Sequence, residues 1–427
     1  MPASMEQQHE AQELQVIGIL TLDGLNNDNY GAFMQAWALK QALTKVVAQQ
    51  KQAAHATGTP AQRIVVGLIK HSSASPAQIA RQRSLQFMAQ RPTSKLKEDR
   101  KLALQLFRHE LARLKRFAAF SPSLRIDLPP NTPLKPEQLK LVIGSDWVWY
   151  FDQKSPVLPL FLGDLPQFQE CKRYAYAASF GIARPEDPAY QSYAPYLNAQ
   201  WAKFRAISLR EPTWLTEFER LNLNLPLGSV TQVVDPALLL TRADYQPLVE
   251  QPLSTQPYIL IYSLPFEHKD EDVHALLDVL TAYVEQSGTS GLKIVDISKY
   301  HILGRPQFTA RLKEIGLDYE FHYDTGPAEF VNWVAHAQLL LTPSFHGLMY
   351  SLIFNTPFCY FILRAQDPRL VSLEQLYDIE PLKLVPGRSF DLTAFTAARA
   401  HSQKVFEEQV AQLRAHSYQI LNSIIQD

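Results

Sequence analysis

Short apolar runs alternate with amphipathic stretches of helical length along most of this 427-residue chain. The first run, Val16–Leu20, has the length and unbroken apolarity of a strand that is covered on both faces. A loop follows it, then a segment from Phe33 to Leu43 in which apolar residues recur at helical spacing, then a second run, "RIVVGLIK". Strands that alternate with helices in this way predict parallel sheets joined by right-handed crossover connections.

The alternation stops once and then starts again. Further units of the same kind include "KLVIGSD", "KRYAYAASFG", "FRAISLRE" and "SVTQVVDPALLL". The segment Ala243–Pro257 then carries three prolines without periodicity, which predicts a linker. After it the pattern resumes with "YILIYSL", and the chain exceeds the roughly 250–300 residues at which a single core stops growing. We therefore predict two doubly wound α/β domains, residues 1–245 and 246–427.

The last part of the chain, from about Ala394 to Ile425, has the pattern of one long amphipathic helix. Nothing in this stretch suggests a further strand. We expect this helix to pack back across the pair of domains.

One segment departs from the alternation because it is strongly basic. Between Arg81 and Arg116 there are eleven Lys or Arg residues and three Asp or Glu residues, with leucines interspersed. This predicts a basic helical insertion in the first domain, at about residues 75–120. Two interpretations stay open, a solvated helix face or a dock for an anionic partner such as a lipid diphosphate or an acidic membrane leaflet.

Composition limits the cellular setting and the partners. The formal net charge of −1 gives no general attraction to nucleic acid, and Cys171 and Cys359 are too few for a disulfide framework. The N-terminal segment lacks the basic and then apolar order of a signal peptide, and no apolar run reaches the length of a spanning helix. We expect a cytoplasmic protein, with the basic insertion as the candidate for peripheral contact with the inner face of the membrane.

The sequence lacks the common phosphate-binding motifs and gives little support for a metal site. The sequence contains neither G-x-G-x-x-G nor G-x-x-x-x-G-K-[ST], which argues against an NAD enzyme and a P-loop NTPase. The segment "HKDEDVH" offers side chains that bind metals, but acidic residues at the start of a helix are favoured by the helix dipole in any case. We therefore predict no metal site.

The segment "SFHG", Ser344–Gly347, lies where a predicted strand ends and a predicted helix begins. Unpaired N–H groups and the positive end of the helix dipole make such a place suitable for an anion. The alternatives are that Ser344 is only a helix cap and that His346 is a satisfied histidine of the core.

Two other strand ends carry charged side chains. "AISLREP" places Arg210 and Glu211 after an apolar strand, where the arginine could bind a phosphate or carboxylate or could pair with the glutamate. "VIGSDW" places Ser145 and Asp146 at a loop tip, where the aspartate could bind a substrate or cap a turn. Ligands of open α/β sheets bind at this edge of the sheet.

These stretches together resemble the polysaccharide pyruvyl transferase family. The matching pieces run in the order of the family across most of the chain: "NDNYGAFMQAWAL", "VIGSDWVW", "ASFG", "SLRE", "VVDPALLL", "GPAEFVNWVAHAQLLLTPSFHGLMYSLIFNTPF" and "PRLVSLEQL". The resemblance implies a GT-B-like architecture of two Rossmann-like domains that face each other across a cleft, the first on the acceptor side and the second on the donor side. It implies transfer of a pyruvyl group from phosphoenolpyruvate to a sugar of a surface polysaccharide or lipid-linked glycan precursor.

The resemblance also implies roles for individual residues. His346 would be the acid/base or phosphate contact, Arg210 would clamp the anions of the donor, and no metal or organic cofactor is needed besides phosphoenolpyruvate as co-substrate. Further binding residues are implied for the donor (Ser344, Gly347 and Arg369) and for the acceptor (Asn29, Tyr30, Ser145 and Asp146).

The sequence departs from the family's usual pattern at Trp147, Tyr150, Pro343 and Leu348, which lie at the predicted pocket. Two other functions are therefore kept as alternatives. One is a GT-B-like glycosyltransferase that uses a sugar nucleotide, and the other is a non-catalytic protein of glycan assembly.

Overall fold

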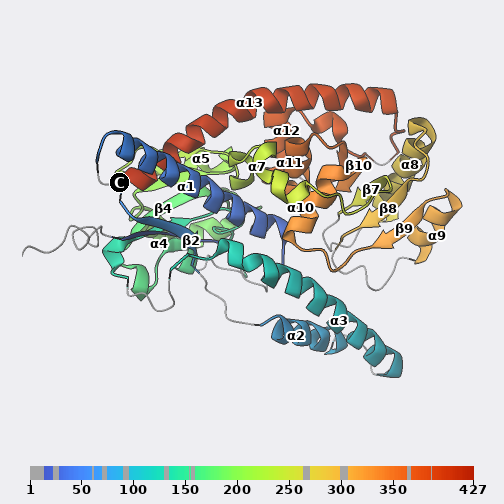
Figure 1. Ribbon diagram of the computed structural model, residues 1–427, viewed down its shortest axis with the longest axis horizontal. Helices are drawn as coiled ribbons and strands as arrows, with labels where there is room; N and C mark the ends of the chain where they lie inside the picture. The colour runs from blue at the N-terminus through green and yellow to red at the C-terminus, as the bar shows by residue number, and fades with distance from the viewer. Residues whose placement is uncertain are drawn as a thin grey trace, which may run out of the picture.

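A computed structural model describes residues 14–22, 28–59, 62–69, 75–89, 96–128, 134–152, 154, 159–262, 270–298, 306–362, 367–385 and 387–427. Within these ranges the chain forms two parallel β-sheets, each flanked by helices (Figure 1). This confirms the prediction of two α/β domains with a long helix at the end of the chain.

The first sheet has the strand order β2-β1-β3-β4-β5-β6, and every pair is parallel. Its strands are β1 (Gln15–Leu20), β2 (Ile64–Leu68), β3 (Leu139–Ile143), β4 (Lys172–Ala178), β5 (Ala206–Leu209) and β6 (Thr231–Gln232). Helix α1 (Tyr30–Ala56) packs on one face, and α4 (Pro188–Trp201) and α5 (Leu215–Leu221) pack on the other. Covering both faces explains why these strands are continuous apolar runs rather than alternating ones.

The second sheet has the order β11-β10-β7-β8-β9 and is also parallel. Its strands are β7 (Tyr258–Ile261), β8 (Lys293–Asp296), β9 (Asp318–Phe321), β10 (Leu339–Thr342) and β11 (Phe358–Tyr360). The helices of this domain are α8 (Asp270–Ser287), α9 (Pro306–Glu314), α10 (Pro327–His336), α11 (Phe345–Phe354) and α12 (Pro368–Tyr377).

The segment between the sheets is more ordered than a linker. Helices α6 (Pro236–Leu239) and α7 (Arg242–Val249) occupy it, so the prediction of an irregular linker from Ala243 was wrong for its first part. Thr241 and Asp244 form a capping box, in which the side chain of each residue accepts a hydrogen bond from the backbone amide of the other. That local signal starts a helix despite the proline at position 247.

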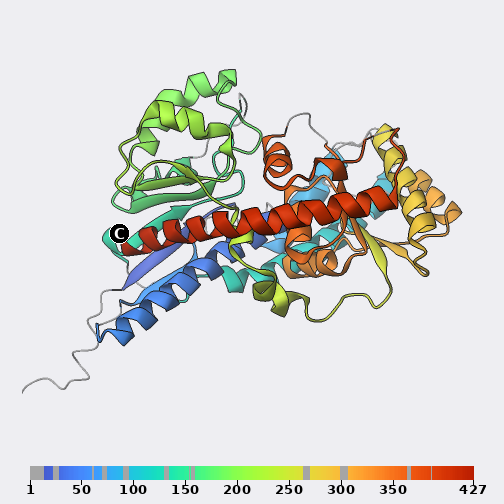
Figure 2. The ribbon, with the colours of Figure 1, turned by 90° about the horizontal axis from the view of Figure 1, so that it is seen from above.

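Helix α13 (Leu392–Gln426) runs back over both domains (Figure 2). Its end is fastened to the first sheet, because Lys140 Nζ donates to the Ile425 carbonyl at 2.6 Å and the Tyr174 hydroxyl donates to Asp427 Oδ2 at 2.6 Å. Arg205 also pairs with the Asp427 carboxylate, whose pKa it lowers to about 2. The helix therefore ties the second domain to the first.

The predicted basic insertion is a helical hairpin formed by α2 (Pro76–Ala89) and α3 (Leu96–Phe120). The two helices pack on one another through a small core of Ile79, Ala80 and Leu114. The hairpin extends away from the body of the molecule, below both domains in Figure 1. No helix in the described ranges has the combination of length and apolarity required to cross a membrane.

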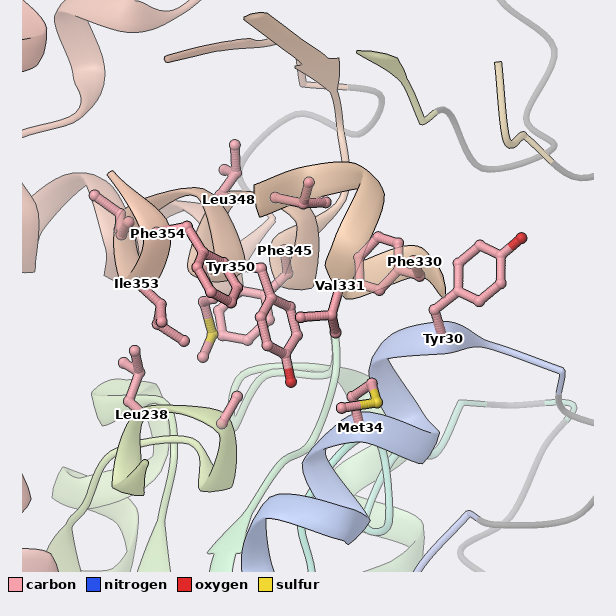
Figure 3. Close-up of a cluster of buried hydrophobic side chains, with 14 of the residues drawn as sticks. Tyr30, Met34, Leu238, Phe330, Val331, Phe345, Leu348, Tyr350, Ile353 and Phe354 are labelled. Carbon is pink, nitrogen blue, oxygen red and sulfur yellow. The ribbon is translucent and has the colours of Figure 1, made fainter. Parts of the chain in front are cut away.

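The two domains share a continuous apolar interface (Figure 3). Met34 of α1 and Leu238 of α6 lie on the side of the first domain, opposite Val331 of α10 and Tyr350 of α11 in the second domain. All four side chains are buried. This interface packs helices α1 and α6 of the first domain against α10 and α11 of the second.

Candidate active site

Polar side chains that follow strands of both sheets meet between the two domains. Asp146 follows β3, Arg210 follows β5 and Asp235 begins α6 just after β6, while His346 lies in the first turn of α11 after β10. The carboxyl ends of parallel strands share one edge of a sheet, so this placement follows from the topology. All four residues are buried.

Arg210 is the centre of this group. Its Nη1 donates to Asp146 Oδ1 at 3.1 Å and to Asp235 Oδ2 at 3.0 Å, and its Nε donates to Glu211 Oε1 at 2.5 Å. Burial alone would lower the pKa of Arg210, but the three carboxylates raise it above its ordinary value. The guanidinium also lies over the Phe345 ring, 4.4 Å from its centroid. These contacts favour a role for Arg210 in organising the three carboxylates. Its predicted role as a clamp on the anions of the donor stays a prediction.

Asp235 joins Arg210 to His346. Its Oδ1 accepts from the Ala237 amide at 2.9 Å, as the cap of α6, and its Oδ2 lies 3.6 Å from His346 Nε2. Burial would raise the pKa of this carboxyl, but His346 and Arg210 lower it to about 2. Asp235 is therefore a stable carboxylate that can hold and orient a protonated imidazole.

Sequence reasoning missed Asp235. The segment "VVDPALLL" was recognised as a piece of the family pattern, but an aspartate before a proline at a helix start is usually only a cap. The side chain is such a cap, and it also faces the second domain. The available signal was its position after an apolar run, the same signal that pointed to Arg210 and Asp146.

His346 is enclosed but has a free ring nitrogen. Its side chain is 6% exposed, and Nε2 has no hydrogen-bond partner among the described residues, since 3.6 Å is longer than a hydrogen bond. Gly31 of α1 lies directly against the ring, where a Cβ atom would be 2.1 Å from Nδ1. The imidazole therefore lies between the two domains with one buried nitrogen that has no hydrogen-bond partner among the described residues, and its acid/base role stays a prediction.

Ser344 and Gly347 stand at the start of α11. The Ser344 hydroxyl accepts from the Gly347 amide at 3.3 Å, so Ser344 is the helix cap that the sequence left as an alternative. The Ser344 amide in turn donates to the Thr342 hydroxyl at 3.0 Å. Donor binding by Ser344 and Gly347 stays a prediction.

Ser145 and Glu211 complete the buried polar group. The Ser145 hydroxyl donates to Gln35 Oε1 at 3.0 Å and lies 3.5 Å from Asp235 Oδ2. The Ser179 hydroxyl donates to Glu211 Oε1 at 3.0 Å. Burial raises the pKa of Glu211, against the opposing effect of Arg210. Gln35 and Ser179 lie in two pieces of the family pattern, "NDNYGAFMQAWAL" and "ASFG", but neither was predicted as a site residue.

Arg369 lies at the edge of the group. Its guanidinium pairs with Asp367, with Nη2 2.7 Å from Oδ2, and lies 5.0 Å from the centroid of the Trp147 ring. Trp147 directly follows Asp146 and also contacts Tyr150, with ring centroids 4.7 Å apart. Arg369 is thus near the carboxylates without being bound to them, and its donor-binding role stays a prediction.

Asn29 and Tyr30 are held in other contacts. Asn29 Oδ1 accepts from the Gly31 amide at 2.9 Å, as the cap of α1. The Tyr30 ring is fully buried and stacks on Phe330 at 4.9 Å, and its hydroxyl accepts from Arg113. Burial raises the pKa of Tyr30 to about 12. These contacts favour a structural role for both residues, and acceptor binding stays a prediction.

The described residues offer no metal site. Among them, no three His, Cys, Asp or Glu side chains are grouped so that they could hold a metal ion. The side chains of the "HKDEDVH" segment lie outside the described part of the chain.

The space next to the buried group is small. A cavity of about 20 Å³ is lined by Arg210, Glu211, Asp235 and Phe345 together with residues of α12 and α13. This volume has room for about one water molecule. As it stands, this cavity is too small to enclose a sugar or an organic phosphate.

Solved structures that resemble this chain are distant in sequence. UDP-GlcNAc 2-epimerase from Neisseria meningitidis bound to UDP-GlcNAc is 8% identical over 97% of this chain and 99% of its own, with a TM-score of 0.44. The N-terminal domain of trehalose-6-phosphate phosphatase from Candida albicans is 9% identical over 96% of each chain, with a TM-score of 0.43. The S. aureus MnaA-UDP structure is 14% identical over 92% of this chain and 90% of its own, with a TM-score of 0.38.

Comparison by sequence gives a clearer result. No curated protein sequence matches the chain. The sequence model of the family described as "Polysaccharide pyruvyl transferase" matches residues 29–363, a range that includes Asp146, Arg210, Asp235 and His346. The chain therefore belongs to the polysaccharide pyruvyl transferase family.

Proposed function

We propose that this protein transfers a pyruvyl group from phosphoenolpyruvate to two hydroxyls of one sugar, in a precursor of a surface polysaccharide or a lipid-linked glycan. The observation that carries the proposal is the buried group of Asp146, Arg210, Asp235 and His346, which joins both domains within the range matched by the family. We place the reaction in the cytoplasm.

The reaction needs proton transfer and charge stabilisation rather than redox chemistry. Two sugar hydroxyls form bonds to C2 of the enol phosphate, the C2–O bond to phosphate breaks, and the methylene carbon gains one proton. Of the two protons released by the hydroxyls, one ends on that carbon and the other on the departing phosphate. A group that both accepts and donates protons near neutral pH is therefore required, and histidine is the side chain best suited to it.

His346 is the proposed proton carrier, and Asp235 is its positioning residue. Nε2 is the free ring nitrogen and lies 3.6 Å from the Asp235 carboxylate, so a proton taken up there is stabilised by a neighbouring negative charge. Arg210 holds Asp235 and Asp146 in place through Nη1. The proposed acceptor contacts are Ser145 and Asp146, which lie on the first domain.

The donor carries a carboxylate and a phosphate, which need cations or N–H donors. Arg369 is the proposed contact, because it is an arginine close to the buried group whose pairing with Asp367 can be exchanged for a donor anion. The first turn of α11, after Ser344, is proposed to supply backbone N–H groups to the same anion.

Gly31→Ala is expected to impair transfer without unfolding the protein. The new methyl group would lie 2.1 Å from the present position of His346 Nδ1, so the imidazole must move. A displacement of about 1 Å in a catalytic group lowers turnover by about a hundredfold. Steady-state transfer rates test this, with Gln49→Ala on the exposed side of α1 as the control. Unchanged turnover in Gly31→Ala would show that the position of the ring does not matter.

The direct test is a transfer reaction with a panel of saccharide acceptors and phosphoenolpyruvate, followed by NMR detection of the ketal and by phosphate release. The proposal requires both products in equal amounts from at least one acceptor. Release of phosphate without a ketal would indicate hydrolysis of the donor, and transfer from a sugar nucleotide would favour the glycosyltransferase alternative.

A further inference from the structure

The α2–α3 hairpin has an electrically balanced root. Arg113 Nε lies 2.7 Å from Asp28 Oδ2, and Arg83 Nη2 lies 2.7 Å from the other oxygen of the same carboxylate. Arg83 Nη1 also pairs with Glu110 Oε2 at 2.5 Å. Two arginines thus face two buried carboxylates. Because these two arginines are paired with carboxylates, they form neither a solvated helix face nor a free site for an anion.

The root also holds the hairpin against the second domain. Arg113 Nη1 donates to the Tyr323 carbonyl at 3.2 Å, and the Tyr323 hydroxyl donates to Glu110. On the surface, Arg116 Nη1 pairs with Glu329 Oε1 at 2.7 Å. The direction in which the hairpin leaves the body is therefore set by contacts with both domains (Figure 1).

The outer face of α3 has the opposite character. Lys101, Leu104, Arg108 and Lys115 follow one another at intervals of 3, 4 and 7 residues, which places them along one face of a helix. All four are exposed, and the three cations have no ion-pair partner among the described residues. At about 1.5 Å per residue, this face is about 20 Å long.

Large apolar side chains of the hairpin are also exposed. Leu104 is 51% exposed on α3 and Leu85 is 59% exposed on α2, the two highest values for large apolar side chains in the described ranges. Exposed leucines interspersed with cationic side chains are typical of helices that lie on an anionic lipid surface. An acidic protein surface would use the cations but would give less reason for exposed leucines.

We propose that the outer face of α3, defined by Lys101, Leu104, Arg108 and Lys115, docks the protein on an anionic lipid bilayer. The cations bind lipid phosphates and the leucine enters the headgroup region. Because the whole chain has a formal net charge of only −1, the attraction is local to the hairpin. Docking does not depend on the proposed reaction. Its benefit for an acceptor carried on a lipid does rest on that reaction.

The test is sedimentation of the full chain with vesicles of phosphatidylcholine, alone or mixed with phosphatidylglycerol. We expect binding only to the mixed vesicles, and a decrease on the order of tenfold or more in the combined variant Lys101→Glu, Arg108→Glu and Lys115→Glu. Leu104→Ser should weaken binding most visibly at high salt, where the charges are screened.

A matched control separates local from overall charge. The combined variant Lys51→Glu, Lys313→Glu and Lys404→Glu changes the net charge equally at exposed sites outside the hairpin and should keep vesicle binding. Equal loss in both combined variants, or no binding of the wild-type protein to mixed vesicles, overturns the proposal. Capture of an acidic protein partner without vesicle binding would overturn it too. Turnover with a soluble acceptor should stay unchanged in the hairpin variant, which shows that it is folded.

Discussion

Asp235→Asn is expected to lower pyruvyl transfer by about a thousandfold while the protein remains folded. The amide fills the same space and can still accept from the Ala237 amide, but it removes the negative charge 3.6 Å from His346 Nε2 and 3.0 Å from Arg210 Nη1. Proton transfer by a positioned side chain contributes about 10²–10⁴-fold to a rate, and an imidazole without its carboxylate partner loses much of that. The expected decrease is in kcat, measured with saturating donor and acceptor.

The pH profile distinguishes a positioning role from a merely structural one. If Asp235 acts through its negative charge, the limb of the pH–turnover profile that reports the proton carrier should move to lower pH in Asp235→Asn, because the charge that favours protonation is gone. A variant with reduced kcat and an unchanged profile would mean that Asp235 supports only the fold. The matched control is Ser372→Ala. Ser372 lines the same small cavity as Asp235, and its variant should retain normal turnover.

The same carboxylate affects acid stability. The pKa of Asp235 is about 2 in the folded protein, below its ordinary value of 3.8, so its ionised form favours folding by about 2 kcal/mol above pH 4. This contribution is lost as the pH falls from about 4 towards 2. The asparagine variant should lack it, so the difference in unfolding free energy between variant and wild type should shrink in that window.

Asp28→Ala is expected to destabilise the protein by about 3–5 kcal/mol, because it leaves Arg113 buried without its carboxylate. Arg83 is less affected, since it keeps Glu110 as a partner. Urea unfolding measures the loss. The exposed carboxylate of Asp324, 3.8 Å from Arg116, is the control, and Asp324→Ala should change stability by less than about 1 kcal/mol.

A double variant sharpens this prediction. When Arg113→Met is combined with Asp28→Ala, the uncompensated charge is removed, so the double variant should be more stable than Asp28→Ala alone. Strictly additive losses would show that the two side chains do not interact, which would contradict the balanced root of the hairpin.

The sequence predicted those features that depend on local pattern. The continuous apolar runs of β1 and β10 indicate strands that are buried on both faces, and the periodicity of α13 indicates a helix with one buried face. The strands, their parallel pairing and the long closing helix were therefore predicted correctly. The helix α7 was missed because its capping box at Thr241 was outweighed by nearby prolines.

The site depends on contacts between distant residues, and these are harder to predict. The positions of Arg210 and His346 at strand ends were visible in the sequence, but each contacts Asp235, and these contacts join residues 25 and 111 positions apart. The charge of the basic insertion was equally visible. Which of its arginines are paired became visible only when Asp28 and Glu110 were placed beside them.

The most direct test of the account is a thermal-shift titration of the purified protein with phosphoenolpyruvate, alongside phosphate, pyruvate and a panel of sugar nucleotides. We expect saturable stabilisation by phosphoenolpyruvate that is weaker in His346→Ala and Arg369→Ala, with both variants still melting cooperatively. Saturable stabilisation by a sugar nucleotide, with none by phosphoenolpyruvate, would contradict the proposed donor and would favour a glycosyltransferase on the same fold.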